Sequence, residues 1–209
     1  MTRVAIIGAG ISGLACARQL AKAGVSVVVF DKGRGIGGRV ATRRAGDLQF
    51  DHGAPFVRAQ RDDFSALLAS LTVDGSAVPW TDDKGVTWTV GSPGMSAIPK
   101  AMGVGLDVRL GTQILKVNAN QSGWHLHYDE TEYVATHIVM TVPKPQIAGL
   151  LGYRHPLIPQ IADVKMEPGL TLMPTVTGTT PSITPFLPDD PLALITCDSS
   201  KPNRPINES

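Results

Sequence analysis

The chain has 209 residues, and its 19 Lys and Arg residues nearly match its 18 Asp and Glu residues, for a formal net charge of +1. This balance gives no general attraction to polyanions, and no nucleic-acid-binding motif accompanies the basic residues, so we expect no nucleic-acid partner. Hydrophobic residues make up 43% of the chain and charged residues 18%, which is typical of a globular protein with a buried core.

The apolar residues are distributed in a way that predicts neither a membrane span nor a leader peptide. No run approaches the ~18 consecutive apolar residues of a membrane-spanning helix. The apolar start Val4–Ile7 is followed at once by Gly8, and only Arg3 supplies a charge before it. The two cysteines, Cys16 and Cys197, suit neither a disulfide framework nor a metal site. We therefore expect a reducing, cytoplasmic location and no bound metal.

The first 31 residues predict a strand, a helix and a second strand. Arg3–Ile7 and Val25–Asp31 are short, β-branched apolar runs that suit buried parallel strands. Between them, Ile11–Ala23 separates polar from apolar positions with helical spacing, and Gly24 ends the pattern. A strand–helix–strand unit of this length predicts a right-handed crossover between parallel strands.

The rest of the chain predicts a mixture of helices and strands. Helical patterns cover Asp62–Leu71 and Met95–Met102, and a strand is predicted at Val86–Val90. Further strand-like runs, separated by turn residues, are Leu106–Leu110, Gln113–Asn118, Trp124–Tyr128, Tyr133–Ala135 and His137–Val142. Beyond Pro143 the chain is rich in proline, and Leu170–Met173 is strand-like within it.

A glycine motif joins the first predicted strand to the first helix. It reads Gly8-Ala-Gly10-Ile-Ser-Gly13, and a strand before it and a helix after it make this spacing informative. The first glycine permits a tight turn, the second lets backbone approach a pyrophosphate, and the third allows close packing of helix on strand. Asp31 ends the second strand and is suited to hydrogen-bond a pair of ribose hydroxyls. The pattern therefore predicts a dinucleotide site.

The glycine motif is also compatible with two different kinds of protein. A glycine-rich turn can occur in an ordinary α/β protein that binds no nucleotide. An NAD(P)-dependent reductase without flavin would share the three glycines and Asp31, but it would leave the later Gly37-Gly38-Arg39 without a role.

The segment after the second strand concentrates glycine and arginine. It reads Phe30-Asp-Lys-Gly-Arg-Gly-Ile-Gly-Gly-Arg-Val-Ala-Thr-Arg-Arg44. A dinucleotide diphosphate carries two charges and one helix terminus offers about half a charge, so an added guanidinium is a suitable complement. Neighbouring glycines would let the backbone pass close to it. The side chains of Arg34, Arg43 and Arg44 need not contact the diphosphate. It is at least as plausible that they are solvated charges of a loop, or that they form a cationic entrance for an anionic substrate.

With Gly37-Gly38-Arg39 and Thr42 placed after Asp31, the sequence resembles the flavin-containing amine oxidase superfamily. More narrowly, it is similar to the bacterial renalase-like FAD-dependent oxidoreductases, on the strength of the Phe30–Arg44 segment and of three further motifs: Asp51-His-Gly-Ala-Pro-Phe56, Gly91-Ser-Pro-Gly-Met95 and Ser199-Ser-Lys-Pro202.

This resemblance implies FAD as the cofactor and a set of binding residues along the chain. They are Gly8, Gly10, Ile11, Ser12, Gly13, Asp31, Lys32, Gly37, Gly38, Arg39, Thr42, His52, Gly53, Ala54, Pro55 and Ile114. Within this set, the resemblance places His52 to Pro55 alongside the flavin ring and ribityl chain, and the Ile114 backbone against adenine.

The resemblance also implies a fold and a domain organisation. We expect an α/β protein with a Rossmann-like FAD-binding domain of the amine-oxidase type and an α+β substrate domain. The FAD-binding domain would comprise residues 1–75 and 105–150, and the substrate domain 76–104 and 151–209. Members of the superfamily close the flavin site with a C-terminal Gly-Asp segment, which is absent before Ser209. The expectation is therefore a C-terminally truncated chain, with a non-catalytic fragment as an alternative.

The implied activity is oxidation of a small electron-rich substrate by hydride transfer to flavin, with oxygen as the acceptor. The substrate would be a dihydronicotinamide isomer, related to NAD(P)H, or an amine. The sequence predicts no catalytic residue, because hydride donation to a flavin requires no protein base. A lone histidine such as His52, and the aromatic side chains of Trp80 and Trp88, are more often structural.

Overall fold

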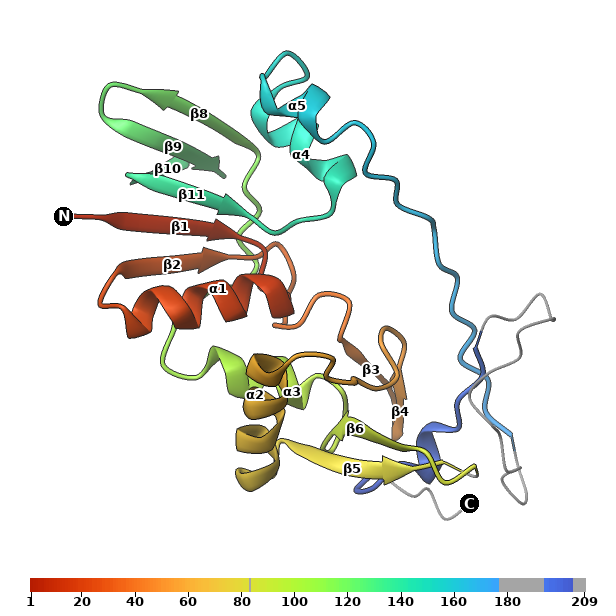
Figure 1. Cartoon of the computed structure of the whole chain (residues 1–209). Helices are drawn as coiled ribbons and strands as arrows, with labels where there is room; N and C mark the ends of the chain where they lie inside the picture. Colours follow the sequence, from red (N-terminus) through yellow and green to blue (C-terminus); the bar gives the residue numbers. More distant parts are fainter. Residues whose placement is uncertain (83, 177–193, 205–209) are drawn as a thin grey trace. The chain divides into compact units, whose positions relative to one another are not determined.

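The structure is a computed structural model that describes residues 1–82, 84–176 and 194–204 (Figure 1). The chain divides into two compact units: Met1–Gly38 with Met102–Leu170, and Arg39–Ala101 with Thr171–Ser209. These boundaries differ from those of the predicted domain segments, and the assignment of those segments to cofactor and substrate stays a prediction.

A four-stranded parallel sheet organises the first unit. Its strands are β1 (Arg3–Ile7), β2 (Ser26–Phe30), β7 (Asp107–Arg109) and β11 (His137–Met140), in the order β11-β1-β2-β7. Helix α1 (Ile11–Lys22) connects β1 to β2, which confirms the predicted strand–helix–strand unit. Ile7 pairs in register with Phe30 and with Met140, so the carboxyl ends of these strands share one edge.

An antiparallel sheet of β8 (Lys116–Asn120), β9 (Gly123–Tyr128) and β10 (Thr131–Ala135) covers the face of the parallel sheet opposite α1 (Figure 1). Side chains alternate along a strand, so every second residue of β1 and β2 faces this layer. The shared core consists of Ala5, Ile7, Val28, Phe30, Ile114, Val117, Leu126, Ala135 and Leu150. Leu150 comes from α4 (Lys144–Leu151), which was not predicted and which precedes the short α5 (Leu157–Gln160).

Two hairpins and one long helix organise the second unit. The hairpins are β3 (Thr42–Ala45) with β4 (Leu48–Asp51), and β5 (Ala77–Thr81) with β6 (Thr87–Gly91). The helices are α2 (Asp62–Val73), α3 (Ala97–Gly103), which crosses the unit boundary, and the 3₁₀ turn η1 (Asp198–Ser200). The buried side chains include Leu68, Leu71, Trp80, Val90 and Met95.

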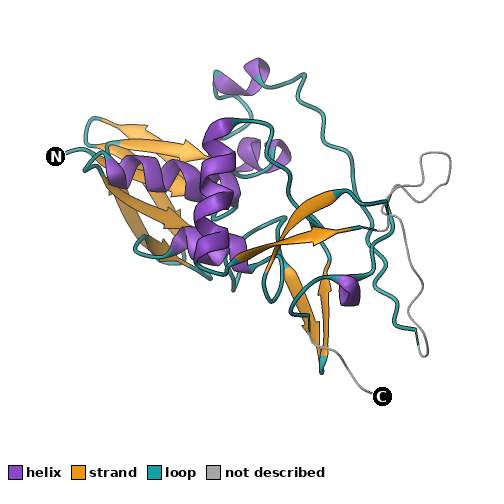
Figure 2. Ribbon diagram, turned by 60° about the horizontal axis from the view of Figure 1, so that its bottom comes forward, coloured by secondary structure: helices purple, strands orange, loops and turns teal. Residues whose placement is uncertain are grey.

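The sequence patterns missed three strands of the second unit and predicted one that is absent. β3, β4 and β5 are short and carry few buried apolar residues, so their patterns are weak. Leu170–Met173 was predicted as a strand, but this segment is loop, and the chain beyond α5 has only the η1 turn among its described residues (Figure 2). Leu170 and Leu172 are exposed and pair with no strand of the described chain, so their apolar character reflects no buried ladder. Among the described residues, no helix has the length and apolar content needed to cross a membrane.

Candidate functional site

The glycine motif forms the turn from β1 into α1, and two of its glycines are required by the chain's own atoms. Gly8 has a φ of +112°, and a Cβ there would lie 2.7 Å from Thr141 Oγ1. A Cβ on Gly13 would lie 2.0 Å from the Gly8 carbonyl oxygen. The tight turn predicted for Gly8 and the close helix–strand packing predicted for Gly13 are therefore both present.

Gly10 is different, because no atom of the described residues accounts for its missing side chain. A Cβ on Gly10 would meet nothing within 4 Å, and its φ of −77° suits any residue. Gly10 is the N-cap of α1, where no side chain among the described residues caps the helix and the first turn holds no acid. Open space beside the uncapped N–H groups of a 12-residue helix suits a phosphate group. The geometry of the loop thus fits a dinucleotide diphosphate.

Asp31 lies at the carboxyl end of β2, next to this loop. Its Oδ2 accepts a 2.6 Å hydrogen bond from the Ala9 N–H, and its Oδ1 accepts a 2.7 Å bond from the Gly33 N–H. A carboxylate offers about four acceptor positions, so capacity remains for two ribose hydroxyls. The neighbouring Lys32 is exposed. The glycine turn therefore orients Asp31 through the Ala9 N–H, and the sequence pattern did not predict this contact.

The double glycine packs directly on the same turn. Gly37, with a φ of +125°, donates its N–H to the Ala9 carbonyl oxygen at 2.9 Å and forms a β-bridge with Gly10. A Cβ on Gly38, whose φ is +54°, would lie 3.5 Å from Gly10 Cα. The positive φ values explain why glycine occupies both positions. The structure thus brings the first glycine motif, Asp31 and the double glycine together within the first unit.

Three other predicted residues of this unit lie at the expected elements. Ile11 and Ser12 form the first turn of α1. The Ile114 side chain is only 6% exposed and belongs to the shared core. No described residue hydrogen-bonds the N–H or carbonyl of Ile114, whereas its neighbour Leu115 donates to the His127 carbonyl at 2.8 Å. A contact of the Ile114 backbone with adenine stays a prediction.

The remaining predicted residues lie in the second unit, where several contact one another. The exposed Arg39 accepts a 2.8 Å hydrogen bond on its carbonyl from the Ala54 N–H. A Cβ on Gly53 would lie 2.1 Å from the same carbonyl oxygen, so this position requires glycine. The half-buried Pro55 follows Ala54. His52 has a buried Nδ1 with no hydrogen-bond partner among the described residues, and its carbonyl accepts a 3.1 Å bond from the hydroxyl of Thr171.

Thr42, predicted as a cofactor contact, has its hydroxyl engaged inside the second unit. It donates to Asp51 Oδ1 at 2.7 Å and accepts from the Ser96 N–H at 3.0 Å. These bonds tie β3 to the end of β4 and to the segment before α3. A flavin contact through this hydroxyl stays a prediction.

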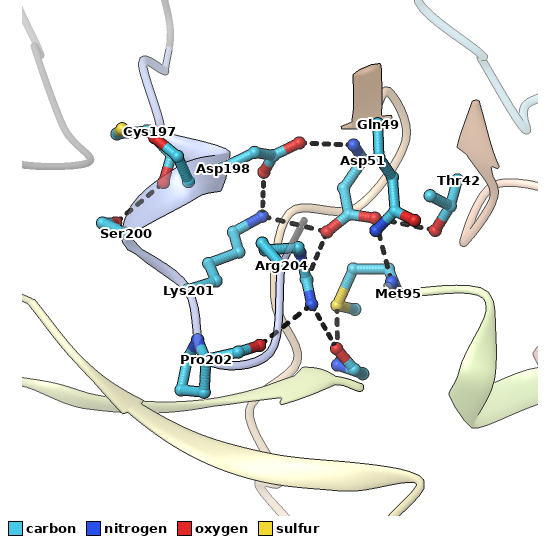
Figure 3. Close-up of polar contacts among 12 residues, drawn as sticks. Thr42, Gln49, Asp51, Met95, Cys197, Asp198, Ser200, Lys201, Pro202 and Arg204 are labelled. Carbon is cyan, nitrogen blue, oxygen red and sulfur yellow. Dashed lines mark hydrogen bonds and ion pairs between the residues drawn. The ribbon is translucent and has the colours of Figure 1, made fainter. Parts of the chain in front are cut away.

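Asp51 is the centre of a buried ionic cluster that sequence reasoning missed (Figure 3). Arg204 Nη2 lies 2.6 Å and Lys201 Nζ 3.2 Å from Asp51 Oδ2, and the Met95 N–H donates to Oδ1 at 2.9 Å. Asp198 accepts from Lys201 Nζ and from the Asp51 N–H. The side chains of Asp51 and Lys201 are fully buried, and that of Arg204 is 2% exposed. Two acids and two bases thus close a neutral cluster around η1.

The local sequence held little signal for this cluster. Asp51 is paired with residues about 150 positions later in the chain. Lys201 appeared only as part of a family-like motif, and neither Asp198 nor Arg204 stood out from the other charged residues. A charged residue at the end of a strand is usually solvated, so only the tertiary contacts distinguish these four residues.

The pKa of Asp51 is lowered from its ordinary value of 3.8. Burial alone would raise the pKa of Asp51, but Lys201, the Met95 N–H, Arg204 and the Thr42 hydroxyl together stabilise the charged form more strongly. The unfolded chain therefore binds a proton at Asp51 at a higher pH than the folded chain does. The contribution of ionised Asp51 to the stability of the folded chain is present above about pH 3.8, and it is lost as the pH falls through the lower pKa of the folded state.

We expect urea unfolding midpoints of the chain to decrease as the pH falls below 3.8, in part through protonation of Asp51. An Asp51→Asn variant lacks this titration, so its midpoint should depend less steeply on pH over the same window. Equal pH slopes for the two proteins would contradict the predicted contribution.

Trp80 and Trp88, interpreted from the sequence as structural, are engaged in packing. Trp80 is 6% exposed and pairs in register with Trp88 across β5 and β6. Trp88 Nε1 donates to Asp82 at 3.0 Å, and the Phe56 ring lies 4.1 Å from the Trp88 ring, centroid to centroid. These contacts account for both side chains without a ligand.

Comparisons with known proteins match two parts of the chain to described families. Residues 6–71 match the NAD(P)-binding Rossmann-like domain, and residues 81–177 match the flavin containing amine oxidoreductase family. A Mycobacterium tuberculosis protein that carries the provisional name flavin-containing monoamine oxidase AofH is 37% identical over 70 residues, which are 34% of this chain and 15% of that protein. Protoporphyrinogen oxidase 2, chloroplastic/mitochondrial, of Arabidopsis thaliana is 36% identical over 69 residues, which are 33% of this chain and 14% of that protein.

Solved structures extend the similarity in fold. A double mutant of putrescine oxidase superposes with a TM-score of 0.61 at 16% identity, covering 74% of this chain and 62% of that one. The chain thus spans less than two thirds of the length of these relatives. The superposition and the Rossmann-like match confirm the predicted α/β, Rossmann-like fold.

Proposed function

Because residues 81–177 match the flavin containing amine oxidoreductase family and residues 6–71 match the NAD(P)-binding Rossmann-like domain, we propose that the chain is a member of the flavin-containing amine oxidase superfamily that binds FAD and acts as an FAD-dependent oxidoreductase. Gly10 is the observation that carries the proposal, since no packing contact of the described residues requires the open space at Gly10 beside the uncapped start of α1. Residues of the first unit would hold the adenosine diphosphate part: the glycine turn and Gly37-Gly38 at the diphosphate, Asp31 at the ribose and the Ile114 backbone at adenine.

The reaction would be oxidation of a small electron-rich substrate, with dihydronicotinamide isomers and amines as the candidate classes. When bound, FAD would supply the electron chemistry as the hydride acceptor, and molecular oxygen would serve as the final acceptor. The chain's own residues would bind and orient the cofactor. The renalase-like motifs around Asp51, Gly91 and Ser199 support the dihydronicotinamide class, and the match to the flavin containing amine oxidoreductase family supports the amine class.

A visible spectrum of the purified chain, recorded after incubation with FAD and removal of free flavin, tests the proposal. We expect flavin absorption bands and saturable binding in a titration with FAD. Absence of flavin binding would overturn the proposal. Binding of NADPH to a chain that retains no flavin would instead favour a nicotinamide-dependent reductase.

Arg39→Ala is expected to weaken FAD binding by about 2 kcal/mol, roughly thirtyfold, as for one charge-assisted hydrogen bond. Arg39 follows Gly38 directly in the chain, and its guanidinium is exposed and free of ion pairs among the described residues. The measurement is the FAD dissociation constant from fluorescence quenching.

The matched control is Arg44→Ala, which removes another exposed arginine from the same segment. Arg44→Ala should leave the FAD dissociation constant nearly unchanged, because Arg44 is not expected to contact the diphosphate. A general cationic field, by contrast, would depend on both arginines alike. Equal losses for the two variants, or no loss for Arg39→Ala, would contradict the diphosphate role of Arg39.

A further inference from the structure

Thr141 lies directly beneath the glycine turn, at the carboxyl end of β11. Its hydroxyl oxygen lies 3.0 Å from the Gly8 carbonyl oxygen and 3.1 Å from that of Ile7, within donor distance of both. Its own N–H donates to the Ile7 carbonyl at 2.9 Å. Thr141 therefore holds the last residue of β1 and the first residue of the turn.

The Gly8–Ala9 peptide unit is held from both of its polar ends. The Gly8 carbonyl accepts from the Thr141 hydroxyl, and the Ala9 N–H of the same unit donates to Asp31 Oδ2 at 2.6 Å. A peptide unit is planar, so rotation about its axis displaces both groups together. Gly8 has no Cβ to restrict its own backbone at a φ of +112°, so the orientation of the unit depends on these two contacts and on the flanking bonds from the Gly8 N–H to the Phe30 carbonyl at 2.8 Å and from the Gly37 N–H to the Ala9 carbonyl at 2.9 Å.

We propose that Thr141 is a positioning residue that acts through the Gly8–Ala9 peptide to orient the Asp31 carboxylate toward the ribose of a bound dinucleotide. The ribose part of this inference rests on the proposed FAD function. Loss of the Thr141 hydroxyl frees the peptide to rotate, the Ala9 N–H then leaves Asp31, and the carboxylate loses the bond that fixes its Oδ2.

Thr136 offers a matched control on the same pair of strands. Its hydroxyl donates to the Arg3 carbonyl at 2.8 Å and accepts from the Arg3 N–H at 2.9 Å. Both threonines thus bind the backbone of β1 through their hydroxyls, but Thr136 does so at the amino end of the strand. Thr136→Val removes an equivalent contact to the same strand without touching the glycine turn.

The first test needs no ligand and measures hydrogen exchange of the Ala9 amide in the full chain. We expect Thr141→Val to speed this exchange about tenfold, the equivalent of one lost hydrogen bond, while Thr136→Val leaves it unchanged. Thr141→Ser, which keeps the hydroxyl, should restore the wild-type rate. Unchanged Ala9 exchange in Thr141→Val would overturn the proposal. If the valine variant does not fold by circular dichroism, Thr141→Ala takes its place.

The second test is a double-mutant cycle on the FAD dissociation constant with Asp31→Asn. Thr141→Val should weaken binding about tenfold in the wild-type background and much less beside Asp31→Asn, because both changes remove the same oriented carboxylate. Thr136→Val should have the same small effect in both backgrounds. Additive losses for Thr141 and Asp31 would overturn the positioning role. A wild-type chain that binds no FAD would overturn both the proposed function and the ribose-binding role of Asp31. The exchange rates of the Ala9 amide would still decide whether Thr141 holds the Gly8–Ala9 peptide.

Discussion

We expect Asp51→Asn to lower the free energy of unfolding by about 3–5 kcal/mol, the range found when one partner of a buried ion pair is removed. The substitution keeps the size of the side chain but leaves Lys201 and Arg204 buried with only Asp198 as an acidic partner. The penalty is therefore the cost of an uncompensated buried charge rather than the loss of a single attraction. Urea unfolding measures it, followed by the intrinsic fluorescence of Trp80 and Trp88 in the same unit, with Trp124 of the first unit as a further contributor to the signal.

Asp63→Asn serves as the matched control for this prediction. Asp63 also pairs with an arginine, Arg61, at 3.4 Å, but both side chains are mostly exposed. Exposed pairs contribute little to stability, so the midpoint should hardly change. A loss for Asp51→Asn no larger than that for Asp63→Asn would mean that water reaches the cluster and screens it.

The β1, α1 and β2 elements of the first unit could be predicted because their signals are local. The β-branched runs of β1 and β2 and the helical spacing of α1 each lie within one short window of sequence. The spacing of Gly8, Gly10 and Gly13 likewise predicts a tight turn, the approach of backbone to a pyrophosphate and close packing of helix on strand. None of these predictions needs residues that are distant in sequence. The predicted roles of Gly8 and Gly13 agree with the close contacts that a Cβ would make there, whereas a Cβ on Gly10 would meet no described residue within 4 Å.

The parts that could not be predicted depend on partners far away in sequence. Thr42 matched a family pattern, yet its hydroxyl is engaged by Asp51 and by the Ser96 backbone. The role of Thr141 beneath the glycine turn arises only when β11 pairs with β1, more than 130 positions earlier. A threonine near the end of a strand is a common residue in sequence, and only the sheet register gives its hydroxyl a function.

Gly13→Ala should remove FAD binding and also destabilise the free chain, on the order of 3 kcal/mol. The added Cβ would lie 2.0 Å from the Gly8 carbonyl oxygen and 2.8 Å from Thr141 Oγ1, so α1 must move away from β1. Backbone rather than a flexible side chain forms the closest contact, so relief by a rotamer change is not available. Thermal unfolding of the apo chain and a titration with FAD measure the two effects separately.

Gly10→Ala is the matched change at the neighbouring glycine, and it should separate binding from stability. Its Cβ meets no atom of the described residues within 4 Å and its φ of −77° suits alanine, so the free chain should unfold close to the wild-type midpoint. FAD binding should nevertheless fall at least tenfold, because the methyl group occupies the space through which the diphosphate approaches the start of α1. Undiminished FAD binding by Gly10→Ala would contradict the proposed position of the diphosphate beside Gly10. The open space at this glycine would then not be explained by a bound ligand. A loss of stability without a ligand would show instead that Gly10 is required by the fold, as Gly13 is.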